Sequence, residues 1–349
     1  MFLNVYTLFK HTIKNDFCSI MNIKTNFLLF TIILSFSSHC TENFDQFYST
    51  SFLKNYAAVR QSLQEHGFTK VTFKTPDNLT LHGLFLSRPN AICTVIVCAG
   101  WLPGKKEGMA TFYALLPEHC NILFFDARGH GESDGSLLWN LWRYGMDEYK
   151  DILGAITYLN HTNNLPIIIT GICSGAFNAA HALISLEKSN KQAESNVKGL
   201  IFDSGWGSVT EIARTAPLAG IEKRLPALFT FIYRTKQQIK QSSLYKLCSL
   251  LTQNSCKIGY HLCAKQLVGQ YEQATTLFDK IHHITLPIFF IHSDDDTYAI
   301  KSDALKLSQL ASHTLCWWIK KSFHAKHHLI HRELYKEKIS HFIDTVIQQ

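Results

Sequence analysis

The sequence contains little charge, and this shortage already limits what the protein can be. Only 17% of its 349 residues are charged and 46% are hydrophobic, so the chain can bury a large core. That balance excludes an intrinsically disordered protein and a coiled coil. The 34 Lys and Arg exceed the 27 Asp and Glu by +7. An excess of this size does not by itself indicate nucleic acid, and we expect no nucleic-acid partner.

The ten cysteines include no CxxC pair, and no set of Cys and His has the spacing of a zinc site. We therefore expect neither a metal nor another cofactor. Cys93, Cys98 and Cys120 lie in or beside apolar runs, where a thiol acts as a small hydrophobic group. Cys256 and Cys263 could pair in an exported protein, although their spacing does not fix a disulfide geometry.

Long apolar runs are also missing, but a shorter one stands near the start of the chain. Residues 27–36 follow a short basic head and have the length of a signal-peptide core, which is too short for an ordinary membrane span. We predict that residues 1–40 are a signal peptide or an N-terminal anchor, with Cys40 leaving lipidation open. The protein is then exported or membrane-associated, or cytoplasmic if the leader is retained as structure. Residues 41–67 form an N-terminal extension.

Residues 68–349 have the pattern of a single α/β domain. Two strand-like runs separated by turn residues, 70–74 and 79–86, predict a hairpin. Short, continuously apolar runs then alternate with helical spacing, as in a parallel sheet covered on both faces. The predicted strands of this sheet are Thr94–Cys98, Asn121–Phe125, Ile167–Thr170, Gly199–Phe202, Pro287–Ile291 and Thr314–Ile319. We expect a doubly wound, mostly parallel sheet closed by a helix over Glu333–Ile347.

Residues 206–279 interrupt this rhythm and predict a small helical cap over the site. Between residues 206 and 265, nine Lys and Arg stand against two Glu, a local charge of 9 − 2 = +7. One interpretation is a basic, apolar lid that meets an anionic membrane surface or acyl substrates. The other is a solvated cap helix whose apolar face lies on the core of the domain.

The segment Gly171–Gly175 (GICSG) follows a buried strand and opens a helix of small residues, which is the setting of a nucleophile elbow. Such a turn needs small residues two positions before and two positions after its central residue. Cys173 meets this requirement, whereas Ser174 would be flanked by Ile172. The spacing therefore favours Cys173 as the nucleophile. The alternative is an ordinary glycine-rich turn with a buried thiol.

The run Phe124–Gly135 (FFDARGHGESDG) resembles the loop after the fourth strand of α/β-hydrolases, in particular the branch of serine aminopeptidase-like lipases and acyl hydrolases. The resemblance extends over about 71–347 and is weakest in the predicted cap. It implies an α/β-hydrolase fold, and in this loop it implies structural roles for Asp126 and Arg128. We assign no chemistry to His130.

The same resemblance implies an acid after a late strand. The run from Ile291 to Asp296 matches the family pattern best at Asp296, although Ser293 replaces the usual glycine. Asp294 and Asp295 compete with it and are better explained as solvated or turn-capping groups. Asp203, at the end of an earlier strand, occupies a second place where this fold can carry the acid.

The expected base is His324, because it follows the final predicted strand, as the resemblance implies. Three further histidines crowd the same loop. They lack an accompanying carboxylate or cysteine set, so we interpret them as exposed groups rather than metal ligands. The three are His327, His328 and His331.

These residues together predict a Cys173–His324–Asp296 triad, with the backbone N–H groups of Trp101 and Ser174 as the oxyanion hole. The GxCxG elbow resembles that of dienelactone hydrolases. The predicted substrates are small acyl compounds, namely carboxylic esters, lactones or thioesters. The alternative is a catalytically silent hydrolase fold that serves in binding, because the cysteine, Ala99 and Ser293 depart from the usual family residues.

Overall fold

The computed structural model describes residues 53–100, 111–135, 146–209, 212 and 275–348. The chain divides into two units after Asn55, and the sheet belongs to the second, Tyr56–Gln349. The predicted leader, 1–40, lies outside the described residues. So does the predicted cap apart from its two ends, and both remain predictions. Among the described residues, no helix combines the length and apolar character needed to cross a bilayer.

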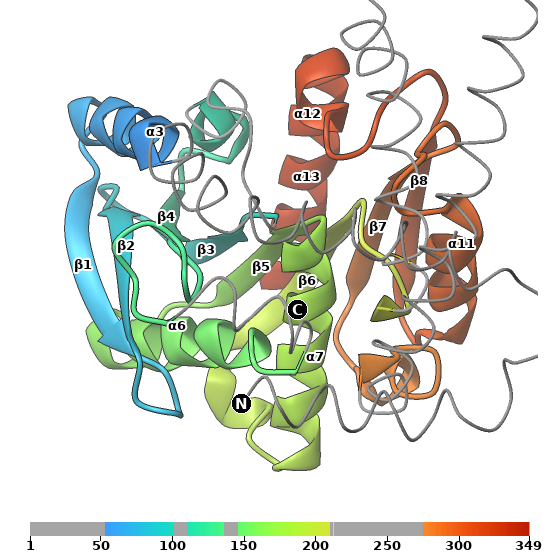
Figure 1. Cartoon of the computed structure of the whole chain (residues 1–349), viewed down its shortest axis with the longest axis horizontal. Coiled ribbons are helices and arrows are strands. Elements are labelled where there is room, and N and C mark those ends of the chain that lie inside the picture. The colour runs from blue at the N-terminus through green and yellow to red at the C-terminus, as the bar shows by residue number, and fades with distance from the viewer. Residues whose placement is uncertain (1–52, 101–110, 136–145, 210–211, 213–274, 349) are drawn as a thin grey trace, which may run out of the picture. The chain divides into compact units, whose positions relative to one another are not determined.

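Eight strands form one sheet in the order β1-β2-β4-β3-β5-β6-β7-β8. β2 pairs antiparallel with β1 and with β4, and the other pairings are parallel. The strands are β1 (Thr69–Lys74), β2 (Thr80–Leu86), β3 (Cys93–Cys98), β4 (Cys120–Phe125), β5 (Ile167–Ile172), β6 (Val197–Asp203), β7 (Ile288–Ser293) and β8 (Thr314–Ile319). The predicted hairpin and the predicted mostly parallel sheet are confirmed. Figure 1 shows β1 and β8 at opposite edges.

Helices cover both faces of the sheet. One core cluster joins the strands to α6 (Tyr149–Thr162), α7 (Ser174–Lys188) and α11 (Lys301–Leu310). The other joins them to α3 (Leu53–Glu65) and α13 (Arg332–Ile347). Successive strand residues point to opposite faces, so Ile96 and Val97 belong to different clusters. Burial on both sides explains why the inner strands β3, β4, β5 and β7 are continuous apolar runs in the sequence.

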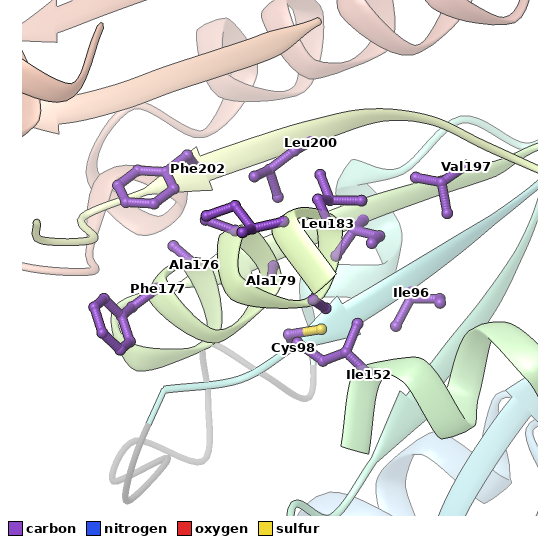
Figure 2. Close-up of a cluster of buried hydrophobic side chains, with 14 of the residues drawn as sticks. Ile96, Cys98, Ile152, Ala176, Phe177, Ala179, Leu183, Val197, Leu200 and Phe202 are labelled. Atoms are coloured by element: carbon purple, nitrogen blue, oxygen red, sulfur yellow. The ribbon is translucent and has the colours of Figure 1, made fainter. Parts of the chain in front are cut away.

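The close packing of α7 on the sheet depends on small side chains. Ala176 and Ala179 are fully buried, and Figure 2 shows them with Phe177 beside Leu200 and Phe202 of β6. Small residues let the helix axis approach the strands without a gap. The N-terminus of α7 is thereby held directly after β5, with Cys173 between the two elements.

The loop after β4 is fastened by buried ionic contacts. The Arg128 guanidinium donates to Asp151 at 2.7 Å and to Asp77 at 2.9 and 3.1 Å. Gly131 has a φ of 54°, and a Cβ there would lie 2.0 Å from an oxygen of Asp126. The glycines of the FFDARGHGESDG run thus meet a steric demand of the loop.

We predict that His181 makes the fold sensitive to acid. Its Nε2 lies 2.8 Å from the carbonyl oxygen of Thr275, and burial lowers the pKa of His181 to about 4. The unfolded chain takes up this proton first as pH falls from about 6.5. The stability contributed by the neutral ring is therefore present above that pH and is lost towards pH 4, by about 2 kcal/mol. Urea unfolding across this range measures the loss.

The control is His181→Gln, which retains a hydrogen-bond donor but has no titrating ring. Its unfolding free energy should fall less steeply with acid than that of the wild type. Equal slopes in the two proteins would contradict the assignment to His181.

Candidate active site

Cys173 occupies a sharp turn between β5 and α7. Its backbone has φ 60° and ψ −121°, a region that residues other than glycine rarely adopt. A Cβ on Gly171 would lie 2.4 Å from the Cα of Ala176, and one on Gly175 would lie 2.0 Å from the carbonyl oxygen of Cys98. The steric requirement inferred from the GxCxG spacing is therefore met by backbone contacts on both sides of Cys173.

The turn brings Cys173 to the predicted base. The Sγ of Cys173 lies 3.1 Å from Nε2 of His324, and Nδ1 of His324 lies 2.7 Å from Oδ2 of Asp296. The Cys173 side chain is partly exposed and that of His324 is 15% exposed, while that of Asp296 is fully buried. Thiol, imidazole and carboxylate thus form a continuous line from the surface into the protein.

Asp296 has the environment of an ionised carboxylate. Its Oδ1 accepts the backbone N–H groups of Tyr298 at 2.9 Å and Ala299 at 3.0 Å. Burial opposes ionisation, but the hydrogen bond and charge of His324, the charge of His292 and the Tyr298 amide outweigh it and lower the pKa of Asp296. A carboxylate held in this way can fix the orientation of the imidazole.

The electrostatics of His324 favour its protonated form. Burial acts against the imidazolium, but the charge of Cys173 and the hydrogen bond to Asp296 outweigh it and raise the pKa of His324 well above 6.5. The ring of Tyr298 lies against the imidazole, with 5.3 Å between ring centroids. His324 is therefore placed to take a proton from the thiol and to keep it during a reaction.

The competing acids have other partners. Asp203 is fully buried and accepts hydrogen bonds from Ser204 and Tyr335. Asp294 pairs with Lys301 at 2.7 Å. Asp295 is exposed and accepts a hydrogen bond from the backbone N–H of Lys321, in the loop between β8 and α12 that carries His324, called here the histidine loop. Of the candidates considered, Asp296 is the one that the structure places on His324.

The other histidines of this region are not exposed as a group. His327 is fully buried and His328 is 4% exposed, because the loop turns inward into α12 (His327–Ile330). His130 is also buried, with Nδ1 3.0 Å from the carbonyl oxygen of Arg128. Within the described ranges, no group of three or more His, Cys, Asp or Glu is arranged to hold a metal ion.

The proposed oxyanion hole is described only in part. Ser174 is the first residue of α7, so its backbone N–H lies at the positive end of the helix dipole. Trp101 lies outside the described residues. Gly100, which precedes it, lies close to the nucleophile, because a Cβ there would be 2.9 Å from the Cβ of Cys173.

A cavity adjoins the elbow between the ends of β3 and β4 and the starts of α6 and α7. Gly100 and Ser174 line it, together with Glu148 and Ile152. Burial raises the pKa of Glu148 to about 7. The lining therefore combines apolar groups such as Ile152 with the charged side chains of Arg128, Asp151 and Glu148.

Backbone strain gathers at this end of the sheet. Among the described residues other than glycine, positive φ angles occur at five asparagines, which tolerate them, and at four other residues. These four are Cys173 (60°), Ser204 (54°), Lys321 (55°) and Ala325 (52°). They lie in the elbow, directly after β6, and in the loop that carries His324. Strain of this kind persists where the surrounding contacts enforce it, often at functional sites.

Most of the chain matches the sequence model of a known protein family. The sequence model of the family described as serine aminopeptidase, S33, matches residues 93–335. The chain belongs to this family. The resemblance read from the loop after β4 is thereby confirmed for the superfamily and for its serine aminopeptidase branch. The nucleophile that we predict for this chain is Cys173, whereas the family is named for serine.

Individual proteins resemble this chain in sequence or in fold, all at less than 30% sequence identity. The uncharacterized protein YfhR of Salmonella typhi is 28% identical over 158 residues, which cover 41% of this chain and 51% of YfhR. The chain thus spans about half the length of this curated relative. The esterase Pf2001 of Pyrococcus furiosus is 16% identical with a TM-score of 0.57, covering 80% of this chain and 91% of the esterase. Est1E of Butyrivibrio proteoclasticus, solved with ferulic acid bound, is 16% identical with a TM-score of 0.51, covering 80% of this chain and 100% of Est1E.

Sequence reasoning missed two groups near the site. His292 lies behind Asp296, with Nε2 3.7 Å from its Oδ2 and 2.9 Å from the carbonyl oxygen of Ala299. Tyr335 and Ser204 surround Asp203. The IHSDDD run offered a signal for His292, because it is the histidine of that pattern. Nothing in the spacing of Tyr335 and Ser204 indicates that they meet.

We predict that Cys173 is alkylated faster than Cys316 by brief iodoacetamide treatment near neutral pH. Cys316 is the more exposed thiol, but partial burial raises its pKa, and Cys173 has an imidazole at 3.1 Å. The expected rate ratio is at least about tenfold, because the thiolate is the reacting species. Peptide mass spectrometry over time measures both sites in one sample. Faster labelling of Cys316 would contradict the assignment of Cys173 as the activated thiol.

Proposed function

We propose that the chain hydrolyses small carboxylic esters, lactones or thioesters through a covalent acyl-enzyme on Cys173. The observation that carries the proposal is the 3.1 Å contact between Cys173 Sγ and His324 Nε2, with Asp296 at 2.7 Å on the other ring nitrogen. Family membership and the shared fold of solved esterases support the same class of reaction.

In the proposed mechanism, His324 Nε2 takes the thiol proton as Cys173 Sγ attacks the acyl carbonyl carbon. The developing oxyanion meets backbone N–H groups at the start of α7 and after Gly100. His324 then gives the proton to the leaving alkoxide or thiolate, and the acyl group remains on sulfur. A water molecule, deprotonated by His324, attacks this thioester, the bond between carbon and Cys173 Sγ breaks, and the carboxylic acid is released. His324 returns the proton to the Cys173 sulfur.

The thiol limits the range of substrates. In an amide's tetrahedral intermediate, the thiolate is a better leaving group than an unprotonated amine, so the intermediate returns to substrate. Alcohols and thiols leave more readily, and the thioester acyl-enzyme is itself activated towards water. We therefore place esters, lactones and thioesters ahead of peptides, although the family is named for peptidases.

The silent-fold alternative is disfavoured by the strain around the site. Each of the four strained residues costs on the order of 1–3 kcal/mol. A chain that used the fold only for binding would have no need to keep these conformations beside an aligned thiol, imidazole and carboxylate. Ala99 and Ser293 change side chains, whereas the proposed contacts depend on main chain and on Cys173, His324 and Asp296.

We predict that Cys173→Ala abolishes hydrolysis of p-nitrophenyl acetate and that Cys173→Ser retains part of it. Serine keeps a nucleophilic atom at the same place, with nearly the same volume and the same flanking glycines. His324→Ala should lower kcat by about 10³-fold or more, as removal of a triad member does. Initial rates over a range of ester concentrations separate kcat from KM.

Cys316→Ala is the matched control, since it removes an exposed thiol far along the chain from the elbow. It should hydrolyse the ester at the wild-type rate. Undiminished activity in Cys173→Ala would overturn the proposal, and wild-type protein without activity on acetate, butyrate and thioester substrates would favour the silent fold.

A further inference from the structure

A second group of serine, histidine and carboxylate lies beneath the site. It consists of Asp203 and Ser204 at the end of β6, Ser322 and His327 in the histidine loop, and Tyr335 of α13. We call these five residues the buried network. All five are 0% exposed, so no substrate reaches them. The five residues have the composition of a catalytic triad, but substrate cannot reach them. We therefore ask which segments of the chain they hold in place.

Every polar contact of the buried network has a donor and an acceptor. Tyr335 Oη donates to Asp203 Oδ2 at 2.8 Å, and Ser204 Oγ donates to Asp203 Oδ1 at 2.7 Å. Since this uses the hydroxyl hydrogen of Ser204, His327 Nε2 must donate to Ser204 Oγ across 2.9 Å. His327 Nδ1 then accepts from Ser322 Oγ at 2.7 Å. One assignment of hydrogens satisfies the whole chain of contacts, which a buried carboxylate requires.

The buried network fastens the loop that carries His324. The backbone N–H of Ala325, the next residue, donates to Ser204 Oγ at 3.1 Å. On the other side of His324, the carbonyl oxygen of Ser322 accepts from Ser293 Oγ at 2.8 Å. Ala325 and Ser204, which both have a positive φ, meet where the loop of His324 contacts the end of β6. The loop is thus held on both sides of the imidazole.

The same network reaches the nucleophile through the main chain. The N–H of Cys173 donates to the carbonyl oxygen of Asp203 at 2.8 Å. Asp203 therefore holds the elbow with its backbone and the histidine loop with its side chain. A change in the position of this one residue moves the thiol and the imidazole relative to each other.

We propose that the buried network is a positioning device that sets the contact between His324 and Cys173, with Tyr335 and His327 as positioning residues. The proposal rests on the proposed function, because it assigns the network a purpose in that reaction. Transfer of a proton between thiol and imidazole depends steeply on their separation, so a loosened loop lowers the rate of chemistry more than it lowers substrate binding.

The test compares Tyr335→Phe with Phe342→Leu, both on α13. Tyr335→Phe removes one hydroxyl and keeps the ring. Phe342 packs on Phe289 with 5.5 Å between ring centroids, and it takes no part in the buried network. Three quantities are measured for each protein: kcat and KM on p-nitrophenyl acetate, the ratio of the alkylation rates of Cys173 and Cys316, and the thermal midpoint.

For Tyr335→Phe we expect kcat to fall about tenfold, KM to stay within about twofold, and the alkylation ratio to fall at least about threefold. Phe342→Leu should lower the thermal midpoint while leaving kcat and the ratio unchanged. If Tyr335→Phe lowers only the thermal midpoint, its role is purely structural and the proposal is wrong.

Ser322→Ala serves as a second variant in case Tyr335→Phe does not fold, since it removes only the hydroxyl that faces His327 Nδ1. For Ser322→Ala we again expect kcat to fall while KM stays nearly unchanged. An unchanged kcat and an unchanged alkylation ratio would contradict the proposed positioning role of the buried network. Should the wild type hydrolyse none of the esters, the proposed function fails. The alkylation ratio then still decides on positioning, because it requires no turnover.

Discussion

The hydrogen bond from the Cys173 amide to the carbonyl oxygen of Asp203 is the contact on which the site depends. It joins the turn after β5 to the last residue of β6, and Cys173 keeps its unfavourable backbone angles partly through it. Parallel strands place their carboxyl ends along one edge of the sheet, which is where loops from β5, β6, β7 and β8 converge. Cys173, Asp296 and His324, the predicted nucleophile, acid and base, all lie at this edge.

Most of the fold could be predicted because its physics is local in sequence. Strands buried on both faces must be apolar throughout. Eight strand-like segments, either continuously apolar or alternating between apolar and polar residues, stand out between turn residues. The helix after Cys173 is marked by its alanines, and the elbow by Gly171 and Gly175. These signals are set by sterics and by the exclusion of water, and both are visible in a window of a few residues.

The surroundings of the site could not be predicted, since they depend on contacts between distant residues. Tyr335 meets Asp203 only because α13 packs on the face of the sheet where β6 ends. His327 was expected at the surface because its histidine cluster lacks the carboxylate or cysteine set of a metal site, yet its two ring nitrogens contact hydroxyl groups in the interior. Its burial follows from those partners, and a sequence window does not contain Ser204. Leader and cap, by contrast, were inferred from composition and lie outside the described residues.

The distance along the chain between thiol and imidazole has a consequence for biosynthesis. Cys173 and His324 are 151 positions apart, and the four strained residues lie between Cys173 and Ala325, the residue after His324. During translation the elbow segment leaves the ribosome long before β8 and the loop behind it exist. A nascent chain therefore carries Cys173 before His324 has been made, and the contact between the two forms only when the last strand joins the sheet. Contacts of such long range also form late in folding. The predicted site is therefore complete only at the end of the protein's own assembly.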